Sequence, residues 1–542
     1  MMRYLFIIAA LLVAAPASAR QEPPHVHDAH THQLGTVHFP NSGSAPAQEP
    51  FLRGVALLHS FEYEDAADAL REAQDADSGF ALAYWLEAIT NSKLLWGRED
   101  TAAAKRVLRR LGATAESRLA RAVTERERGW GAAVEALYVE ADVQTRARAF
   151  AESLRALAAG DPADHEAAAF ASIALQMAEL VGAYGRSERA GIRREAIALA
   201  DRVYRANRDH PGATHYLIHA YDDPEVAAEG LEFARAYAQI APDAQHALHM
   251  PSHIFLQVGL WDDAVASNER AWAASRQWVE RRRASPVALD FHSLEWLQHG
   301  YLQQGRYGAA RALIDTVDAV LRGVDAANSV DPQFVAQRLS FRYAAETRDW
   351  SRTLPSPTTV TADGAETRYA SFSFLSHYQG AVAAILRGDT LAPAIEAFRR
   401  AVADRSGDDT RRGYVMVTTL HVDAFLASVR GERAAATELL ARAAAVEEEI
   451  SPVGPPAVLP TLEWLGDALL AAGRYAEAAD AYERALQRWP NRPRSLIGLA
   501  RARQALGEAN ASASAWRTML ETWHAADAEL PELDEARRGA AR

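Results

Sequence analysis

The sequence predicts an all-α fold, a superhelical solenoid built from stacked helical hairpins. Two observations predict it: apolar residues recur with a period of about 34 residues in several stretches of the 542-residue chain, and within each stretch their spacing is that of a helix. A single hairpin leaves one apolar face exposed to water, so consecutive hairpins must stack to bury it.

The clearest hairpin spans residues 459–491. Small residues such as Gly466 and Ala478 let its two helices approach closely, while larger residues fill the space between hairpins. The residues that occupy the spacing of the tetratricopeptide-repeat (TPR) signature are Leu462, Gly466, Leu469, Tyr475, Ala478, Tyr482, Ala485 and Pro490. The predicted solenoid is therefore of the TPR type, and a further unit follows from Pro493.

Looser helical patterning separates two regions of clear repeats. Units with the same spacing occur at residues 54–73, 211–242, 245–278 and 291–323. From about 331 to 448 the spacing is less regular, because Pro- and Gly-containing segments at 354–364 and 452–456 interrupt the chain. The expected segments are a signal peptide (1–19), a largely unstructured His- and Pro-rich lead (20–46), an N-terminal TPR-like solenoid (47–324), irregular helical repeats (325–455), a C-terminal TPR pair (456–525) and a charged tail (526–542) that is frayed after about Pro531.

The N-terminus has the three parts of a secretory signal peptide: the positive Arg3, an apolar stretch at 5–15, and small residues at 17–19. The apolar stretch is too short to cross a bilayer comfortably, and no later segment reaches the roughly 20 apolar residues of a membrane helix. We expect an exported protein, periplasmic or secreted, without a membrane span.

The composition excludes several kinds of chemistry and partner. The chain has no cysteine, so it has neither a disulfide nor a thiol nucleophile, and a bound metal must use histidine, carboxylate or amide ligands. The formal net charge of −13 argues against nucleic acid or an anionic membrane as the main partner.

The lead segment is rich in histidine, with His25, His27, His30, His32 and His38. Such a tract can bind copper or zinc, or it can be a solvated linker. We interpret the segment either as an unpacked lead or as a strap over the first repeat.

In the middle repeats, histidines fall on the predicted concave face. The first helix of a TPR unit lines that face, and its second, fifth and ninth positions are among those that reach ligands. The fifth and ninth positions of three consecutive units hold the pairs His215 and His219, His249 and His253, and Glu295 and His299. The second positions of the last two units hold His246 and His292, and Asp222 and Asp223 end the first of these helices.

This spacing predicts a metal site. Two histidines four residues apart on a helix have Cβ atoms about 5–6 Å apart, so both imidazoles can reach one ion. Neighbouring helices pack about 8–10 Å apart, so two such pairs can converge on an ion at bond lengths of roughly 2.0–2.1 Å. The candidates exceed what one zinc ion needs, so either two ions bind or some residues orient others. The alternative is a set of satisfied polar residues copied by repeat duplication.

Three further features face inward. Pro251 lies between two of the histidines, where it removes a backbone hydrogen bond and bends the helix; it marks either a functional site or a tolerated kink. His59 is expected to point toward the same interior. Glu463 and Asp467 form a carboxylate pair, suited either to acid–base chemistry or to a solvated acidic groove.

Four stretches resemble a family of large exported bacterial TPR proteins. They are HPGATHYLIHAYDDP (210–224), APDAQHALHMPSHIFLQVGLWDDA (241–264), LGTVHFP (34–40) and GVALLHSFEYEDA (54–66). The resemblance covers most of the mature chain and implies a TPR fold. It also implies that a recurring histidine pattern comprises His215, His219, His246, His249, His253 and His292, and it implies no particular reaction.

We predict first a binding scaffold, whose concave surface holds a protein or peptide partner and whose six histidines bind a divalent metal, zinc or copper, as part of that surface. The alternative is a metal-dependent hydrolase, in which histidine-bound zinc lowers the pKa of its water and Glu295, Asp222 or Asp223 is the general base. The chain contains no HExxH motif, and whether it is an enzyme stays open.

Overall fold

The structure is a computed structural model that describes residues 33–93, 95, 99–182, 184–324, 330–351, 365–390, 392–405, 412–450 and 454–541. The predicted signal peptide (1–19), the predicted interruption at 354–364 and most of the lead, with His25, His27, His30 and His32, lie outside the described residues.

Every regular element within these ranges is a helix. The N-terminal helices are α1 (Ala45–His59), α2 (Tyr63–Ala76), α3 (Ala81–Thr90), α4 (Thr101–Leu111), α5 (Ala115–Leu119), α6 (Glu125–Leu137), α7 (Val143–Gly160), α8 (His165–Val181) and α9 (Arg186–Ala206). The middle helices are α10 (Pro211–Tyr221), η2 (Ala227–Gly230), α11 (Leu231–Ile240), α12 (Gln245–His249), α13 (Pro251–Gln257), α14 (Trp261–Arg282), η3 (Pro286–Ala288), α15 (Phe291–Gln303) and α16 (Tyr307–Arg322). The C-terminal helices are α17 (Val330–Thr347), α18 (Ala365–Leu386), α19 (Pro393–Ala403), α20 (Arg412–Val429), α21 (Arg433–Glu447), α22 (Thr461–Ala471), α23 (Tyr475–Arg488), α24 (Pro493–Ala505), α25 (Ala509–Thr522) and α26 (Pro531–Ala540).

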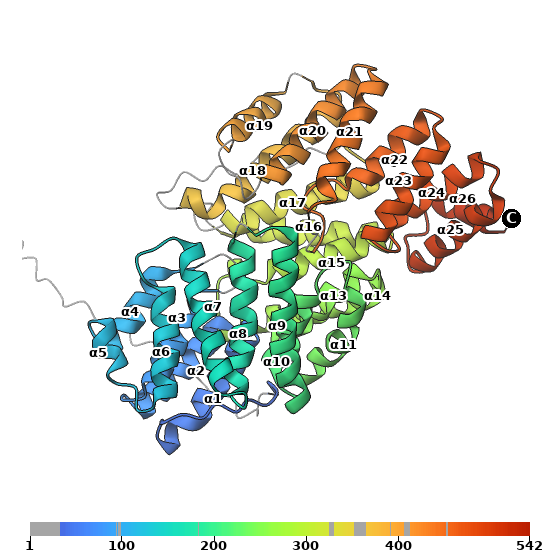
Figure 1. The fold of residues 1–542 in the computed structure, drawn as a ribbon. Helices are drawn as coiled ribbons and strands as arrows, with labels where there is room; N and C mark the ends of the chain where they lie inside the picture. Colours follow the sequence, from blue (N-terminus) through green and yellow to red (C-terminus); the bar gives the residue numbers. More distant parts are fainter. Residues whose placement is uncertain are drawn as a thin grey trace, which may run out of the picture. The chain divides into compact units, whose positions relative to one another are not determined.

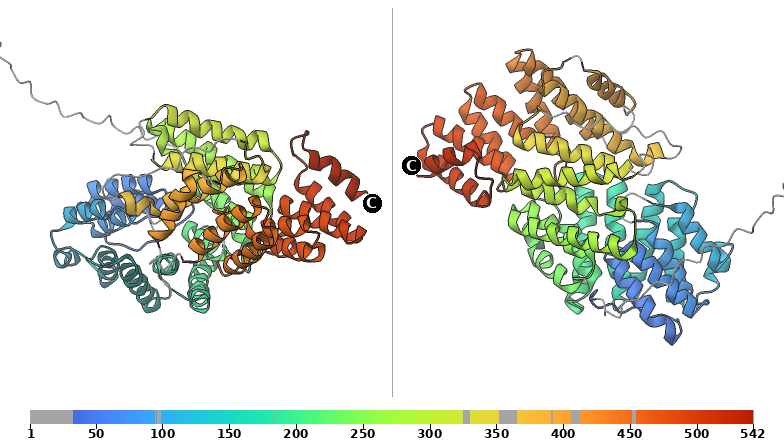
Figure 2. Two further views of the ribbon diagram at one scale, coloured as in Figure 1. Left: turned by 90° about the horizontal axis from the view of Figure 1, so that it is seen from above. Right: turned by 180° about the vertical axis from the view of Figure 1, so that it is seen from behind.

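Consecutive helices pack as hairpins along the chain. Within hairpins, α1 packs on α2, α7 on α8, α20 on α21 and α24 on α25. Successive hairpins are also in contact; for example, α2 contacts α3 and α23 contacts α24. The helices follow one another side by side in the views of Figure 1 and Figure 2. The structure therefore confirms the predicted all-α, helical-hairpin solenoid.

Local sequence sets where the helices begin and how closely they pack. Thr124 and Glu127 form a capping box at the start of α6, and the Asp142 side chain caps α7 by accepting the backbone N–H of Thr145. Gly466 in α22 is required by packing, because a Cβ atom there would lie 2.6 Å from Cε1 of Tyr482. The small residues of the repeat signature therefore let helices approach closely, as predicted.

The lead was predicted to be largely unstructured; residues 33–44 form neither helix nor strand, but they pack against the repeats. Residues 33–44 form an extended strap in which Phe39 is buried and its ring packs on those of Phe51 and Trp130. The backbone N–H of Thr36 donates to the carbonyl of Asp209 at 2.8 Å. Buried aromatic surface and long-range hydrogen bonds hold this segment, which fits the strap interpretation.

The charged tail was predicted to be frayed, and this is wrong. Residues 531–540 form α26, which buries Leu533 and Ala536 on one face. Its Glu532 forms an ion pair with Arg494 of α24 at 2.9 Å. Apolar residues three apart gave this helix a buried side despite its charge.

The C-terminal repeats contact the histidine-bearing half of the chain. The indole Nε1 of Trp261 donates to the carbonyl of Asn491 at 3.1 Å, and Nδ2 of Asn491 donates to the carbonyl of Gly259 at 3.2 Å. Gly259 has φ +72°, and a Cβ atom there would lie 2.4 Å from the carbonyl oxygen of Pro490, so this close approach needs glycine. Contacts therefore link the turn after α13 to the turn after α23.

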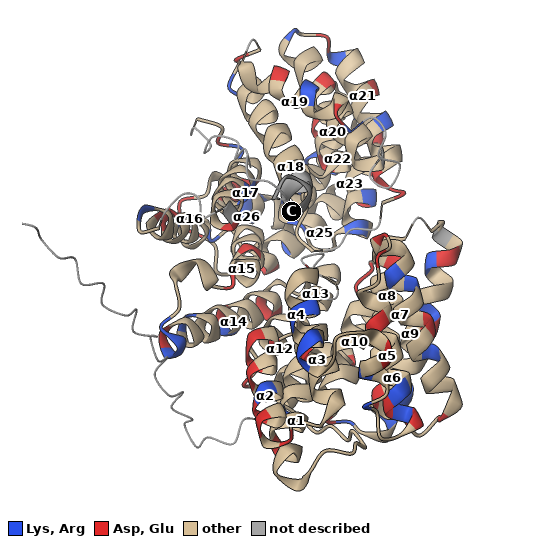
Figure 3. Cartoon of the chain, turned by 90° about the vertical axis from the view of Figure 1, so that its left-hand side faces the viewer, with Lys and Arg blue, Asp and Glu red and all other residues tan. Residues whose placement is uncertain are grey.

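Charged residues of both signs are interspersed over the helices, and acidic residues gather along α2 (Figure 3). Within the described part of the chain, no helix combines the length and the apolar character needed to cross a membrane.

Candidate metal centre

Three consecutive repeats carry the predicted histidines. α10 places His215 and His219 one helical turn apart, α12 and α13 carry His246, His249 and His253, and α15 carries His292. The helix is divided at Met250, because Pro251 has no N–H to donate. Met250 nevertheless keeps helical backbone angles (φ −54°, ψ −36°), so the histidines on either side stay on one face.

The six histidines converge in two groups of three. We call His215, His219 and His246 the first triad, and His249, His253 and His292 the second triad. Within each triad, one nitrogen from every ring lies within 4.8 Å of the others. Each triad therefore combines a pair from one repeat with a single histidine contributed by the next repeat.

The two triads are neighbours. Ring centroids within the first triad are 4.8 to 6.5 Å apart, and those within the second are 4.6 to 6.3 Å apart. Between the triads, the rings of His219 and His253 are separated by 5.5 Å and those of His246 and His249 by 5.7 Å. Rings of different triads are therefore as close to one another as rings of the same triad.

Hydrogen bonds fix the tautomers of two rings in the second triad. Nδ1 of His253 lies 2.7 Å from Oδ2 of Asp222, and Nδ1 of His249 lies 2.6 Å from Oδ1 of Asn268. Asn268 is oriented by its own Nδ2, which donates to the carbonyl of Ala264 at 2.8 Å. Both partners of the histidines are acceptors, so each ring carries its proton on Nδ1 and its lone pair on Nε2.

The two lone pairs of His249 and His253 face each other. Their Nε2 atoms are 3.1 Å apart in the protein interior. Two acceptor nitrogens repel at this distance unless a cation lies between them. Two nitrogens bound to one ion at about 2.0–2.1 Å come this close when the angle at the metal is about 100°.

The first triad is arranged in a similar way. Nδ1 of His215 donates to the backbone carbonyl of His59 at 2.6 Å, which leaves its lone pair on Nε2. Nε2 of His215 and Nε2 of His219 are buried and find no hydrogen-bond partner among the described residues. Buried polar atoms are nearly always satisfied, and these two nitrogens are available to bind a ligand.

Burial keeps these imidazoles neutral. It lowers the pKa of His215 to about 3, and burial followed by the neighbouring imidazoles lowers the pKa of His219, His246 and His249 well below the ordinary value. Neutral imidazole is the form that binds metal, so these four histidines are in their ligand form at neutral pH.

Four of the six histidines are buried instead of lying open on a concave surface, and His219 and His292 are partly exposed. His215 and His249 are fully buried, and His253 is 4% exposed. Stacking of the repeats brings their inward faces into contact with aromatic side chains instead of leaving them to solvent. The candidate metal centre therefore lies mostly in the interior.

Phe61 covers the first triad. Its ring lies 4.4 Å from that of His215 and stacks on that of His246 at 5.3 Å. The residue ends α1 in a left-handed conformation (φ 58°), with Glu62 N–H donating to the carbonyl of Leu57 at 3.0 Å. Glycine is usual at this position of a helix C-terminus, so the backbone accepts strain to hold an aromatic ring on the histidines.

Trp296 covers the second triad. Its ring lies 4.2 Å from that of His253, 5.1 Å from that of His249 and 5.8 Å from that of His292. The segment before α22 packs over this indole at Gly454, where a Cβ atom would lie 2.6 Å from Cζ2 of Trp296. Each triad thus has one aromatic side chain against it.

A third group, His59, Glu166 and His210, also lies close enough for a metal but is a hydrogen-bond hub. Nδ1 of His210 accepts the backbone N–H of Ala213 at 3.1 Å, so Nε2 carries the proton and donates to Glu166. Glu166 also contacts Nε2 of His59 at 2.8 Å and accepts the backbone N–H of His38 at 3.2 Å. Burial alone would raise the pKa of Glu166, but His210 and His59 outweigh it and hold that pKa low. His59 therefore supports the first triad through its carbonyl rather than as a ligand.

The three carboxylates proposed as general bases all have other partners. Glu295 forms an ion pair with Arg338 of α17, and Asp223 forms one with Arg193 at 2.7 Å. Asp222 accepts from His253, as described, and from Nε2 of Gln257 at 2.8 Å. The structure thus assigns Asp222 to orienting a histidine and places Glu295 outside both triads.

The other inward groups also lie outside the triads. His299 is buried beside Trp261, with ring centroids 5.5 Å apart. Glu463 is buried and pairs with Arg492 at 2.7 Å, and Asp467 pairs with Arg348 at 2.7 Å. Both carboxylates of this pair are therefore held by arginines, Glu463 in the interior and Asp467 with its side chain partly exposed.

Sequence reasoning missed two residues at the centre. Asn268 lies on the second helix of its repeat, where the concave-face positions do not reach. Glu62 accepts the backbone N–H of His246 at 2.8 Å, and burial raises the pKa of its carboxyl to about 8. A signal for Asn268 was available, since a polar residue interrupts the apolar stripe of α14 beside Ala264 and Ala271.

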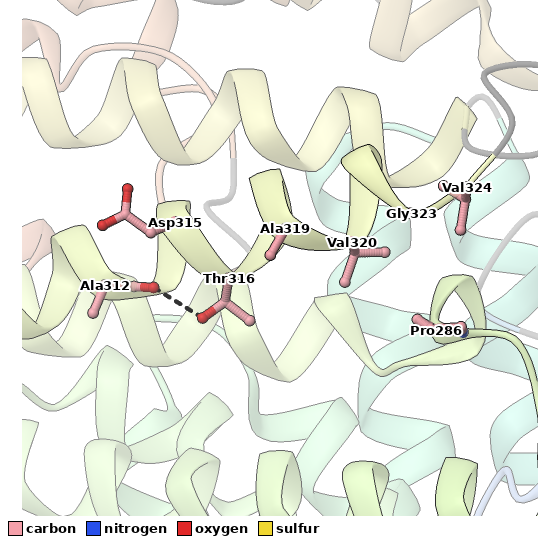
Figure 4. A pocket seen from close by; sticks show the side chains of 8 residues that line it. All are labelled: Pro286, Ala312, Asp315, Thr316, Ala319, Val320, Gly323 and Val324. Atoms are coloured by element: carbon pink, nitrogen blue, oxygen red, sulfur yellow. Dashed lines mark hydrogen bonds between the residues drawn. The ribbon is translucent and has the colours of Figure 1, made fainter.

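An open, mostly apolar hollow of about 600 Å³ lies elsewhere, on α16 and η3 (Figure 4). Ala312, Thr316, Ala319 and Val320 line it along one side of α16, with Pro286 opposite. No triad residue lines this hollow, and it offers one ionisable side chain, Asp315.

Comparison with known proteins identifies the repeat class. Residues 469–520 match the tetratricopeptide repeat family. Among curated proteins, none matches the chain. Similar solved structures include the human IFIT1 dimer with m7Gppp-AAAA, at 15% identity, 90% coverage of this chain, 92% of that chain and a TM-score of 0.35. Yeast Tom70 is similar at 10% identity, 91% and 94% coverage and a TM-score of 0.34.

Proposed function

We propose that this chain, a helical-repeat scaffold, binds a divalent transition metal in its interior through the second histidine triad, and that the metal is zinc or copper. The observation that carries the proposal is the 3.1 Å approach of Nε2 of His249 to Nε2 of His253. Both rings contact acceptors through Nδ1, so a metal ion bound between the two Nε2 lone pairs would satisfy both nitrogens.

The donor set supports this choice of metal. Three neutral imidazoles suit zinc and copper, whereas magnesium and calcium require oxygen ligands. Asp222 and Asn268 supply the acceptors that orient the ligands, as the outer partners of metal-bound histidines generally do. Three protein ligands leave at least one coordination position for water or another small ligand.

Binding is favoured over hydrolysis. A metal-dependent hydrolase needs a general base near the metal-bound water, and Glu295, Asp222 and Asp223 are each held by another side chain. The metal therefore stabilises the packing of the two repeats that supply its ligands and holds a small ligand in the interior.

Partner binding is a separate role. TPR scaffolds generally bind proteins or peptides, and we assign that role to exposed faces of the repeats, apart from the buried metal. The net charge of −13 favours a protein or peptide over nucleic acid. We propose that the protein binds its partner outside the cytoplasm, in the periplasm or after secretion. Cell fractionation of the full chain and of a chain without residues 1–19 would test this location.

Metal analysis of the purified mature chain tests the proposal. We expect stoichiometric zinc or copper in the wild type, a lower melting temperature after chelation, and loss of the second-triad ion in a His249→Ala/His253→Ala variant. His299→Ala is the matched control, because this buried histidine on α15 lies outside both triads and its loss should leave the metal in place. A metal-free wild type that binds neither ion would overturn the proposal.

A further inference from the structure

We propose that the two triads together hold a pair of copper(II) ions as one binuclear centre, bridged by a hydroxide from solvent. This inference rests on the proposed metal site and extends it from one ion to two. Its basis is the juxtaposition of two three-nitrogen ligand sets that share a helix.

The shared helix is α12, which supplies one ligand to each triad. His246 belongs to the first triad and His249 to the second, and they are three residues apart. Side chains at this spacing lie on one helix face with Cβ atoms about 5–6 Å apart. Ions held by these two rings are therefore close neighbours, which the 5.7 Å separation of the ring centroids supports.

Both ligand sets are prepared for metal. In the second triad, Nε2 of His249 faces Nε2 of His253 across 3.1 Å. In the first triad, Nε2 of His215 and Nε2 of His219 are buried and have no hydrogen-bond partner among the described residues. The first-triad observation is independent of the second, and a single ion in the second triad would leave those two nitrogens unsatisfied.

The charges of the surroundings call for a bridging anion. Two divalent ions this close repel strongly in a low-dielectric interior. Asp222 is a carboxylate beside the triads, but it is hydrogen-bonded to His253 and so is not itself a ligand. A water molecule between the ions would lose one proton to solvent, and the resulting hydroxide would occupy the open position of each ion and offset their charge.

The ligands favour copper among the divalent ions. All six are imidazole nitrogens, and nitrogen sites bind copper(II) more tightly than any other first-row divalent ion. Neither thiolate nor carboxylate is present in either triad to select otherwise. Both copper ions remain copper(II) when they bind. The only bond that breaks is one O–H bond of the bridging water, which releases a proton to solvent.

Copper(II) titration into the metal-free full-length chain tests the inference, with metal analysis and electron paramagnetic resonance as the two readouts. We expect two copper ions per chain. The spins of a hydroxide-bridged pair couple, so the loaded wild type should show only a small fraction of the signal expected from its copper content.

Variants that destroy one triad provide the matched comparison. His249→Ala/His253→Ala retains the first triad and His215→Ala/His219→Ala retains the second, so each should bind one ion with its full spin signal. Circular dichroism would establish that each variant is folded. If a variant does not fold, the spin count of the wild type still decides whether the two copper ions form a coupled pair.

The outcomes separate this inference from the proposed function. One ion per wild-type chain with full signal would leave the proposed metal site standing and overturn the pair. Two ions per chain that both give their full electron paramagnetic resonance signal would show that the two sites are independent. That result would overturn the proposed hydroxide bridge. No bound copper or zinc would overturn both proposals.

Discussion

Asp222, at the end of α10, accepts a 2.7 Å hydrogen bond from Nδ1 of His253, which lies one repeat later on α13. The same carboxylate accepts from Gln257 at 2.8 Å. The helix that carries two histidines of the first triad therefore also orients a histidine of the second. The two triads are coupled through this contact as well as through α12.

Replacing Asp222 with asparagine is expected to weaken metal binding by about 10–100-fold, because the neutral amide makes the imidazole of His253 a poorer ligand. Competition with a coloured chelator would measure the affinity. Asp223→Asn is the control, since Asp223 pairs with Arg193 on α9. Equal affinities for the two variants would contradict the role given to Asp222.

The left-handed backbone at Phe61 predicts an unusual order of stability. Both Phe61→Ala and Phe61→Gly should destabilise the protein, because the ring packed on the first triad is lost. The glycine variant should be the more stable of the two by about 1 kcal/mol, since φ of 58° strains alanine but not glycine. Urea unfolding of both variants would reveal the order, and a more stable alanine variant would show that the strain is absent.

Acid should destabilise the fold through His421, outside the metal centre. Its Nδ1 accepts from the hydroxyl of Tyr378 at 2.8 Å and its Nε2 contacts Oγ1 of Thr461 at 2.8 Å, while burial lowers its pKa from 6.5 to about 3. Between these values the unfolded chain binds a proton that the folded chain does not. The free energy of unfolding should therefore fall as pH drops below 6.5, by up to about 1.4 kcal/mol per pH unit for this group.

Urea unfolding at a series of pH values, with the metal removed, would measure this dependence. His421→Gln keeps hydrogen-bonding groups but cannot titrate, so its slope below pH 6.5 should be smaller than that of the wild type. Parallel curves for the two proteins would mean that His421 takes up a proton in the folded state.

Arg492 is predicted to be critical to the C-terminal repeats. It is buried between Glu463 at 2.7 Å and Glu346 at 2.6 Å, so it joins α22 and α17. Arg492→Met should cost about 3–5 kcal/mol, because the buried Glu346 would lose this counter-charge and the buried Glu463 would keep only Arg348, at 3.1 Å. Arg503→Met, which removes more exposed ion pairs on α24, should cost less than about 1 kcal/mol. Calorimetric unfolding of both variants and the wild type would measure the two losses of stability.

The histidine set could be predicted from sequence because two periods define it. Spacing of four residues places His215 with His219 and His249 with His253, and the 34-residue repeat places the pairs on successive helices. The division into triads could not be predicted, since it depends on how His246 and His292 reach back to the preceding repeat.

The charged groups were harder to predict for a related reason. Glu295 is 43 positions from its partner Arg338, and Glu463 is 29 from Arg492. Repeat position indicates which face a carboxylate occupies, but not which arginine of a neighbouring helix neutralises it. The packing of the tail was missed similarly, because the charges of α26 conceal Leu533 and Ala536.

The contacts of Trp261 and Gly259 with Asn491 join repeats more than 200 positions apart. In a linear repeat array each unit touches only its neighbours, so the ends can melt while the centre persists. Here, opening the C-terminal repeats would also uncover the turn behind His253. Loss of order at one end should therefore spread to the other, and the molecule should unfold in fewer, larger steps than its repeat architecture alone would suggest.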